Sequence, residues 1–79
     1  MRRKMTKNEL SILKLINEKG QVTYADIEPL MTQGTHDIYW TTFSTICSMI
    51  QAGIITSEDK HPALYSITAY GRSKAVELL

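Results

Sequence analysis

The sequence predicts a mainly α-helical fold with a small β-hairpin, in the order helix, short strand, helix, helix, two strands, helix. Apolar residues recur at helical spacing in four segments, and residues 54–67 alternate with a period of two. Thr and Gly residues at the segment ends are typical helix caps. With 79 residues, the chain has room for one small core. We expect a basic arm over residues 1–5 and a single domain over residues 6–79.

The first helix is predicted over about residues 6–19. Thr6 and Glu9 have the spacing of a capping box, in which each side chain bonds the other residue's backbone N–H. Leu13 and Ile16 lie on its apolar stripe, and Gly20 is expected to end the helix. The next two residues, Gln21 and Val22, predict a short strand or a turn.

The second helix is predicted over about residues 23–31, with Thr23 as its N-cap and Asp26 in its first turn. Pro29 removes a backbone donor, so this helix should be short or kinked. The third helix is predicted over about residues 35–52, capped by Thr35 and ended by Gly53.

The third helix is expected to bury its large side chains. Phe43 and Ile46 should pack against the first helix, and Cys47 should be a buried structural cysteine. Three aromatic residues of this helix are assigned mostly to the core: Tyr39, Trp40 and Phe43. One of these rings could instead lie in a self-association surface.

A hairpin is predicted over about residues 54–67, followed by a fourth helix over about residues 68–79. The polar residues 58–62 form the turn of the hairpin. Thr68 is expected to cap the fourth helix, with Ala75, Val76 and Leu79 facing inward.

This order resembles that of a winged helix-turn-helix domain. The segment Met49–Ile55 is similar to the end of the recognition helix in bacterial regulators with this fold. The segment Tyr65–Arg72 is similar to the Y-x-L-T-x-x-G-R signature of MarR-like and PadR-like transcription regulators. The resemblance implies a DNA-binding regulator, with the third helix in the major groove and the wing on phosphates. The chain lacks the additional long helices with which those regulators dimerise.

The charge distribution favours a second interpretation. Residues 20–59 contain five acidic residues and no Lys or Arg, whereas both flanking segments are basic. Because DNA affinity comes largely from phosphate neutralisation, a recognition helix without cations should bind weakly. The alternative function is a winged-helix module that binds a protein through this acidic segment and does not bind DNA.

The candidate DNA contacts come from the basic arm, the polar face of the third helix, the wing tip and the last helix. They are Arg2, Arg3, Lys4, Lys7, Thr35, His36, Thr41, Ser44, Thr45, Lys60, His61 and Arg72. The alternative for each is an ordinary solvated surface. Double-stranded DNA is the expected partner, bound by a homodimer. The candidate dimerisation residues are Ile12 and Leu15 on the outer side of the first helix, with Tyr70, Leu78 and Leu79.

No catalytic motif is found, so an enzyme is not expected. His36, His61 and Cys47 lack metal-ligand spacing, and we expect no metal or other cofactor. The single cysteine suits a reducing compartment. No run approaches the ~20 apolar residues that span a bilayer, so we expect a cytoplasmic protein without a membrane segment.

Overall fold

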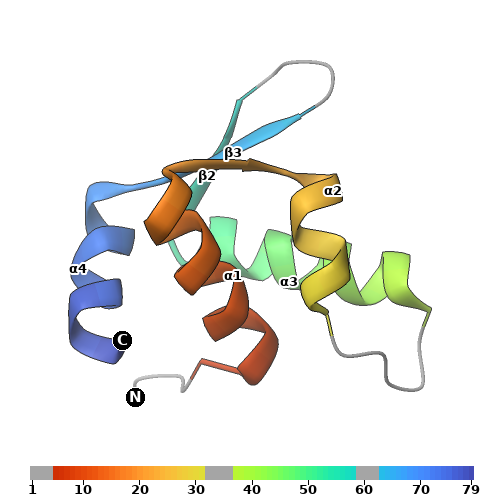
Figure 1. Ribbon diagram of the computed structural model, residues 1–79, viewed down its shortest axis with the longest axis horizontal. Coiled ribbons are helices and arrows are strands. Elements are labelled where there is room, and N and C mark those ends of the chain that lie inside the picture. Colours follow the sequence, from red (N-terminus) through yellow and green to blue (C-terminus); the bar gives the residue numbers. More distant parts are fainter. Residues whose placement is uncertain (1–4, 32–36, 59–62) are drawn as a thin grey trace.

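The computed structural model describes residues 5–31, 37–58 and 63–79, and it confirms the predicted fold class (Figure 1). The division into an arm and a domain stays a prediction. Along the chain the elements are α1 (Lys7–Lys19), β1 (Gln21–Thr23), α2 (Tyr24–Ile27), the 3-10 helix η1 (Glu28–Leu30), α3 (Ile38–Gln51), β2 (Ile55–Glu58), β3 (Leu64–Ile67) and α4 (Ala69–Leu78).

The ends of α1 are those that the sequence predicts. The backbone N–H of Thr6 donates to Glu9 Oε1 at 2.9 Å, and the N–H of Glu9 donates to Thr6 Oγ1 at 3.2 Å. At the other end Gly20 has φ 82°, a conformation that side chains with a Cβ rarely adopt. These local interactions fix the length of α1.

The second helix is short, as predicted. It ends at Ile27, and Pro29 lies in the tighter turn of η1 that follows. The third helix begins later than expected, because Asp37 and not Thr35 is its N-cap. The carboxylate of Asp37 accepts from the backbone N–H of Trp40 at 2.8 Å. Thr35 itself lies outside the described residues.

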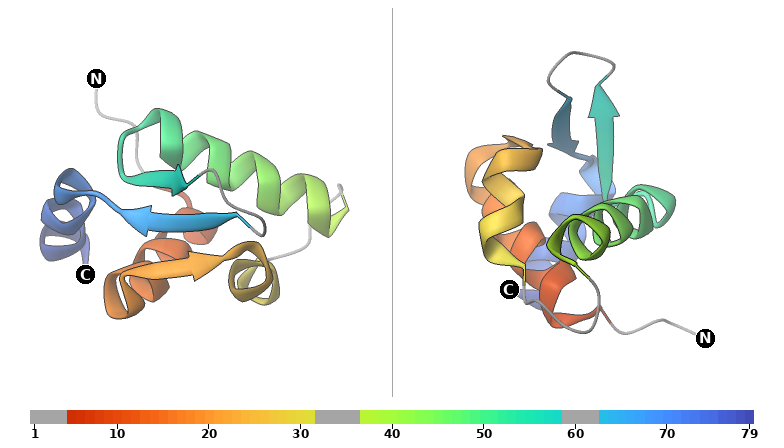
Figure 2. Two further views of the ribbon diagram at one scale, coloured as in Figure 1. Left: turned by 90° about the horizontal axis from the view of Figure 1, so that it is seen from above. Right: turned by 90° about the vertical axis from the view of Figure 1, so that its right-hand side faces the viewer.

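The three strands form an antiparallel sheet in the order β1-β3-β2. Gln21 pairs with Ser66 and Ile55 pairs with Ile67, so β3 lies between strands that precede it in the sequence. Figure 2 shows this order from above and, in its right-hand view, the hairpin β2–β3 projecting beyond the helices. The packing of α3 against β2 places the hairpin directly beside α3.

The core lies between α1, α3 and the sheet. Leu13, Ile16 and Ile46 are buried there as predicted. Ile12 is also fully buried, at 0% exposure, so its predicted place on the outer side of the first helix is wrong. Its side chain belongs to the core cluster and is not available to a partner.

The predicted burial of the aromatic residues on α3 is also wrong. Phe43 is 45% exposed and Trp40 is 55% exposed, and Tyr39 is exposed as well. The inward line of α3 is formed instead by Thr42, Ile46 and Met49, at helical spacing. Thr42 can be buried because its hydroxyl donates to the carbonyl oxygen of Ile38 at 2.7 Å. Cys47 is half-buried, not buried.

The inward face of α4 consists of small residues. Gly71 and Ala75 are buried, whereas Val76 is 87% exposed and Leu79 is exposed. The prediction that Val76 and Leu79 face inward is therefore wrong. Small side chains at the contact let α4 approach the start of β2 closely.

Candidate nucleic-acid interface

Six residues of α3 line a shallow hollow of about 370 Å³ on the outside of the helix. We call them the outer stripe: Trp40, Phe43, Ser44, Cys47, Ser48 and Gln51. Their spacing follows one face of a helix over three turns. Carboxylate, ammonium and guanidinium groups are absent from this set. The outer stripe is therefore an uncharged surface with bulky aromatic groups at its N-terminal end.

Ring contacts hold the aromatic end of the outer stripe in place. The ring centroids of Tyr39 and Phe43 lie 6.0 Å apart with an interplanar angle of 11°. Tyr39 in turn contacts Tyr24 of α2, with centroids 5.8 Å apart. These distances suit favourable aromatic contacts. The row of rings connects α2 to α3 and restricts the position of Phe43.

The three polar candidates on α3 have different surroundings. Thr41 and Thr45 are half-buried, and their hydroxyls donate to the carbonyl oxygens of Asp37 and Thr41 at 3.1 Å and 2.7 Å. Ser44 is exposed and belongs to the outer stripe. The structure thus brings Ser44 together with Trp40 and Phe43 and leaves the two threonine hydroxyls bonded to their own helix.

The sequence prediction missed four residues of the outer stripe: Trp40, Phe43, Cys47 and Gln51. It assigned Trp40, Phe43 and Cys47 to the core because of their size and apolarity. A signal for the correct rotation was present, because Thr42, Ile46 and Met49 also repeat at helical spacing.

The basic side chains of the described residues lie on α1 and α4. Lys7 is exposed in the first turn of α1. Arg72 is exposed near the α1–β1 turn, where its Nη2 would lie 3.8 Å from a Cβ placed on Gly20. At the start of α3, by contrast, the carboxylate of Asp37 occupies the helix N-terminus. Seven candidates lie outside the described residues: Arg2, Arg3, Lys4, Thr35, His36, Lys60 and His61.

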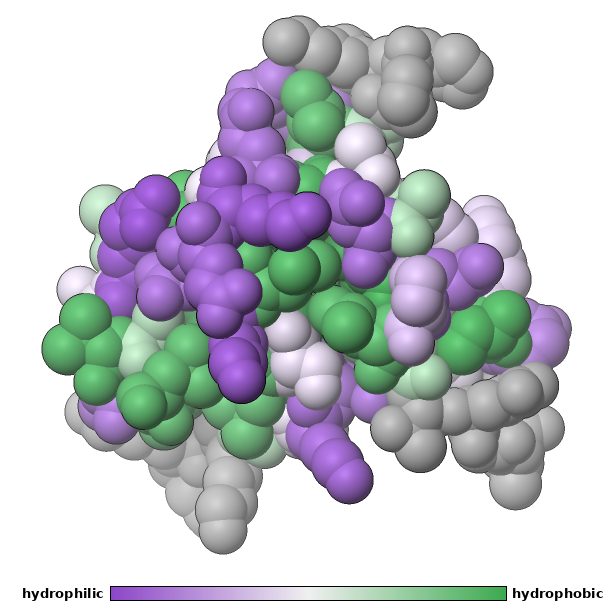
Figure 3. Space-filling view, in the orientation of Figure 1, coloured by the Kyte–Doolittle hydropathy of each residue, from purple (hydrophilic) through white to green (hydrophobic). Residues whose placement is uncertain are grey.

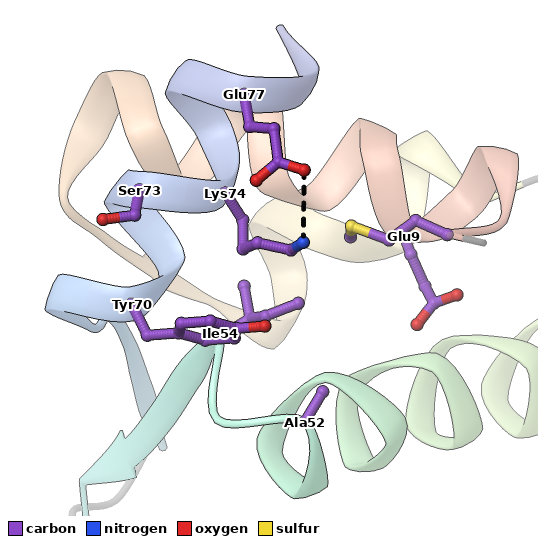
Figure 4. Close-up of a pocket in the computed structure, with 8 residues that line it drawn as sticks. Glu9, Ala52, Ile54, Tyr70, Ser73, Lys74 and Glu77 are labelled. Atoms are coloured by element: carbon purple, nitrogen blue, oxygen red, sulfur yellow. Dashed lines mark ion pairs between the residues drawn. The ribbon is translucent and has the colours of Figure 1, made fainter. Parts of the chain in front are cut away.

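A second hollow, of about 330 Å³, lies between α1, the end of α3 and α4 (Figure 4). Its charged groups face one another, with Lys74 Nζ 3.7 Å from Glu77 Oε1 and 5.9 Å from the centroid of the Tyr70 ring. Glu9, on the opposite wall, is engaged in its capping box. These charges serve contacts within the chain.

The candidate dimerisation residues do not form one surface. Tyr70, Leu78 and Leu79 are exposed on or next to α4, and Figure 3 shows apolar side chains gathered over this helix. Leu15 is half-buried in a separate hollow beside Leu30. The exposed apolar group of α4 is therefore the part of the predicted surface that remains.

Two further features concern the described residues, 5–31, 37–58 and 63–79. None of the helices there is long and apolar enough to cross a membrane. The same ranges contain no cluster of three or more His, Cys, Asp or Glu residues placed to hold a metal ion.

Among solved structures, the chain is similar to the crystal structure of transcriptional regulator Tm0710 from Thermotoga maritima. The match covers 91% of this chain with a TM-score of 0.73 and 18% sequence identity. The chain has a winged-helix fold. In this winged helix, β2–β3 form the wing and α3 is the helix that precedes it.

The winged helix spans about half of that regulator, since the match covers 49% of its length. No protein-family model matches the chain, and no curated protein matches it. The similarity thus establishes the fold, while the function has to be argued from the surface of the winged helix.

Proposed function

We propose that the chain is the DNA-binding module of a transcriptional regulator, with α3 entering the major groove. The observation that carries the proposal is the exposed, uncharged outer stripe of α3 beside the wing. A major groove admits one α-helix, and base edges are contacted by side chains on its outer face. The similarity to a transcriptional regulator supports the same function.

Phosphate contacts would come from outside α3. Because residues 20–59 contain no Lys or Arg, the cations that neutralise phosphates must come from the two ends of the chain and the wing tip. We assign this role to the arm residues Arg2, Arg3, Lys4 and Lys7, to Lys60 and His61 at the wing tip, and to Arg72.

The regulator would act as a homodimer. A single winged helix contacts one short half-site, and specific affinity commonly requires a larger interface. Two copies that pair through the exposed residues Tyr70, Leu78 and Leu79 would present two copies of α3.

The test is a fluorescence anisotropy titration with mixed-sequence duplex DNA at several salt concentrations. The full chain should bind at low salt, and deletion of residues 1–4 should weaken binding several-fold. Each lost phosphate contact lowers the slope of log affinity against log salt by about 0.9, so loss of three cations lowers it by up to about 3. Lys14→Gln, an exposed change on α1, is the control and should leave the slope nearly unchanged.

A second function is favoured by one specific observation. Tyr39, Trp40 and Phe43 are exposed side by side, and Tyr and Trp are typical anchor residues of protein interfaces. A protein-binding module of this kind would not bind duplex DNA even at low salt with the arm intact. That result would contradict the proposed DNA-binding function.

A further inference from the structure

The outer stripe has an unusual composition for a helix that faces DNA. In the major groove, guanine is most often contacted by Arg or Lys, and the cytosine amino group by Asp or Glu. From Ile38 to Gln51, α3 contains none of these four residue types. The carboxylate of Asp37, which directly precedes α3, accepts from the backbone at the helix start. The helix therefore lacks the charged side chains that most often recognise a G·C pair.

The side chains that are present match an A·T pair. The C5-methyl group of thymine is recognised by apolar contact, and the N6 and N7 atoms of adenine are recognised by Asn or Gln amides. Trp40 and Phe43, three residues apart, form the apolar end of the hollow, and Gln51 lies at its other end. The stack on Tyr39 restricts the Phe43 ring before any DNA is bound, which lowers the entropy lost on contact.

We infer that α3 selects A·T base pairs, with Trp40 and Phe43 packed against thymine methyl groups and Gln51 bonded to adenine. The inference rests on the proposed DNA-binding function and specifies its sequence preference. On this inference, α3 recognises thymine methyl groups. The cations elsewhere in the chain supply affinity without sequence preference.

The experiment compares the copolymers poly(dA–dT), poly(dA–dU) and poly(dG–dC) in competition for the full-length chain. The first two differ only in the C5-methyl group, which lies in the major groove. Each methyl group buried by Trp40 or Phe43 should strengthen binding about fourfold, in line with the transfer free energy of one such group. The order of affinity should be poly(dA–dT), then poly(dA–dU), then poly(dG–dC).

Variants assign the preference to the outer stripe. Trp40→Ala and Phe43→Ala should lose most of the difference between the two A-containing copolymers while keeping their salt-dependent binding. Leu30→Ala is the control, since it removes another exposed apolar side chain, on η1, and should keep the difference. Trp40 is the single tryptophan of the chain, so its emission in the wild type should also change on binding poly(dA–dT).

The outcomes separate the inference from the function on which it rests. Equal affinity for poly(dA–dT) and poly(dA–dU) would overturn the inference and leave DNA binding established. A preference that survives in both α3 variants would overturn it as well, because another part of the chain would then recognise the methyl group. Absence of binding to all three copolymers at low salt would overturn both proposals.

Discussion

The structure gives a physical reason for the glycine at position 71, which the sequence indicates only as part of the segment Tyr65–Arg72. A Cβ at this position would meet the carbonyl oxygen of Ile54 and would lie 2.8 Å from Cγ1 of Ile67. Three residues earlier, the Thr68 hydroxyl accepts from the Gly71 N–H at 2.9 Å and lies 2.6 Å from the carbonyl oxygen of Gly53. Thr68 and Gly71 together join the first turn of α4 to the start of β2.

Gly71→Ala should therefore destabilise the protein, because the added methyl group meets the backbone. Overpacking of this kind costs about 1–3 kcal/mol. In a domain of this size, each kcal/mol lowers the melting temperature by about 4–8 °C. Thermal unfolding followed by circular dichroism measures the effect. The control is Ser73→Ala, an exposed change in the same helix, and equal melting of the two variants would contradict the packing described here.

Two positions of α3 that lie three residues apart should respond to truncation to very different extents. Ile46 is buried, so Ile46→Ala should lower the free energy of unfolding by about 2–5 kcal/mol. Phe43→Ala removes a ring from the surface and should change it by about 1 kcal/mol or less. Urea unfolding of both variants is the measurement. If Phe43→Ala lowered the free energy of unfolding as much as Ile46→Ala does, Phe43 could not face outward from α3 as described above.

The sequence predicts correctly those residues whose role depends on near neighbours. Thr6 and Gly20 act through partners within four residues, and Thr68 caps α4 through Gly71, three residues later, so their types and spacing suffice. The choice between Thr42 and Phe43 depends on how α3 is rotated against α1 and the sheet. Apolarity alone ranks Phe43 above Thr42, and the hydrogen bond that permits burial of Thr42 becomes visible only in the folded helix.

At the scale of the element, α2 is too short to be stable alone and depends on its N-terminal contacts. Asp26 accepts hydrogen bonds from the Thr23 backbone N–H at 3.0 Å and from its hydroxyl at 3.1 Å. These bonds, the backbone one foremost, hold the pKa of Asp26 below its usual value. The carboxylate form therefore stabilises the helix start.

Asp26→Asn should be less stable than the wild type at neutral pH, and the difference should shrink in acid. Because the pKa is lower in the folded state, the stabilisation is complete above the unfolded pKa of about 3.9 and disappears as the pH falls through the folded value. Melting temperatures of both proteins between neutral pH and strong acid check the sign. If the difference in melting temperature did not change with pH, the charge of Asp26 would not contribute to stability.

The sequence predicts which helix and which hairpin form the candidate site, but it does not predict which side chains of that helix face outward. The order of helices and strands identifies α3 and the wing, because it follows from local periodicity. Which side chains of α3 face outward depends on packing between elements distant in the sequence. The polar type of Ser44 correctly predicts its exposure, whereas the size and apolarity of Trp40 and Phe43 wrongly predict burial.

At the scale of the whole molecule, exposed apolar side chains on α4 favour pairing of two copies. Leu78→Glu would place a charge in that interface and should make the protein monomeric. Leu30→Glu is the matched control, since Leu30 is a similarly exposed leucine on η1. Sedimentation equilibrium at micromolar concentrations should give a dimer for the wild type and the control. A wild-type mass of 9.0 kDa, that of a single chain, would contradict the pairing.

The position of β3 in the middle of the sheet has a consequence for synthesis of the protein. Strands β1 and β2 leave the ribosome before β3, the strand with which both of them pair, has been synthesised. Gln21, for example, cannot pair until Ser66 has emerged. The helices α1 and α3 can form early, whereas the sheet closes only when Leu64–Ile67 has emerged. A chain that stops before β3 exposes two strand edges without partners, which makes it prone to aggregation and proteolysis.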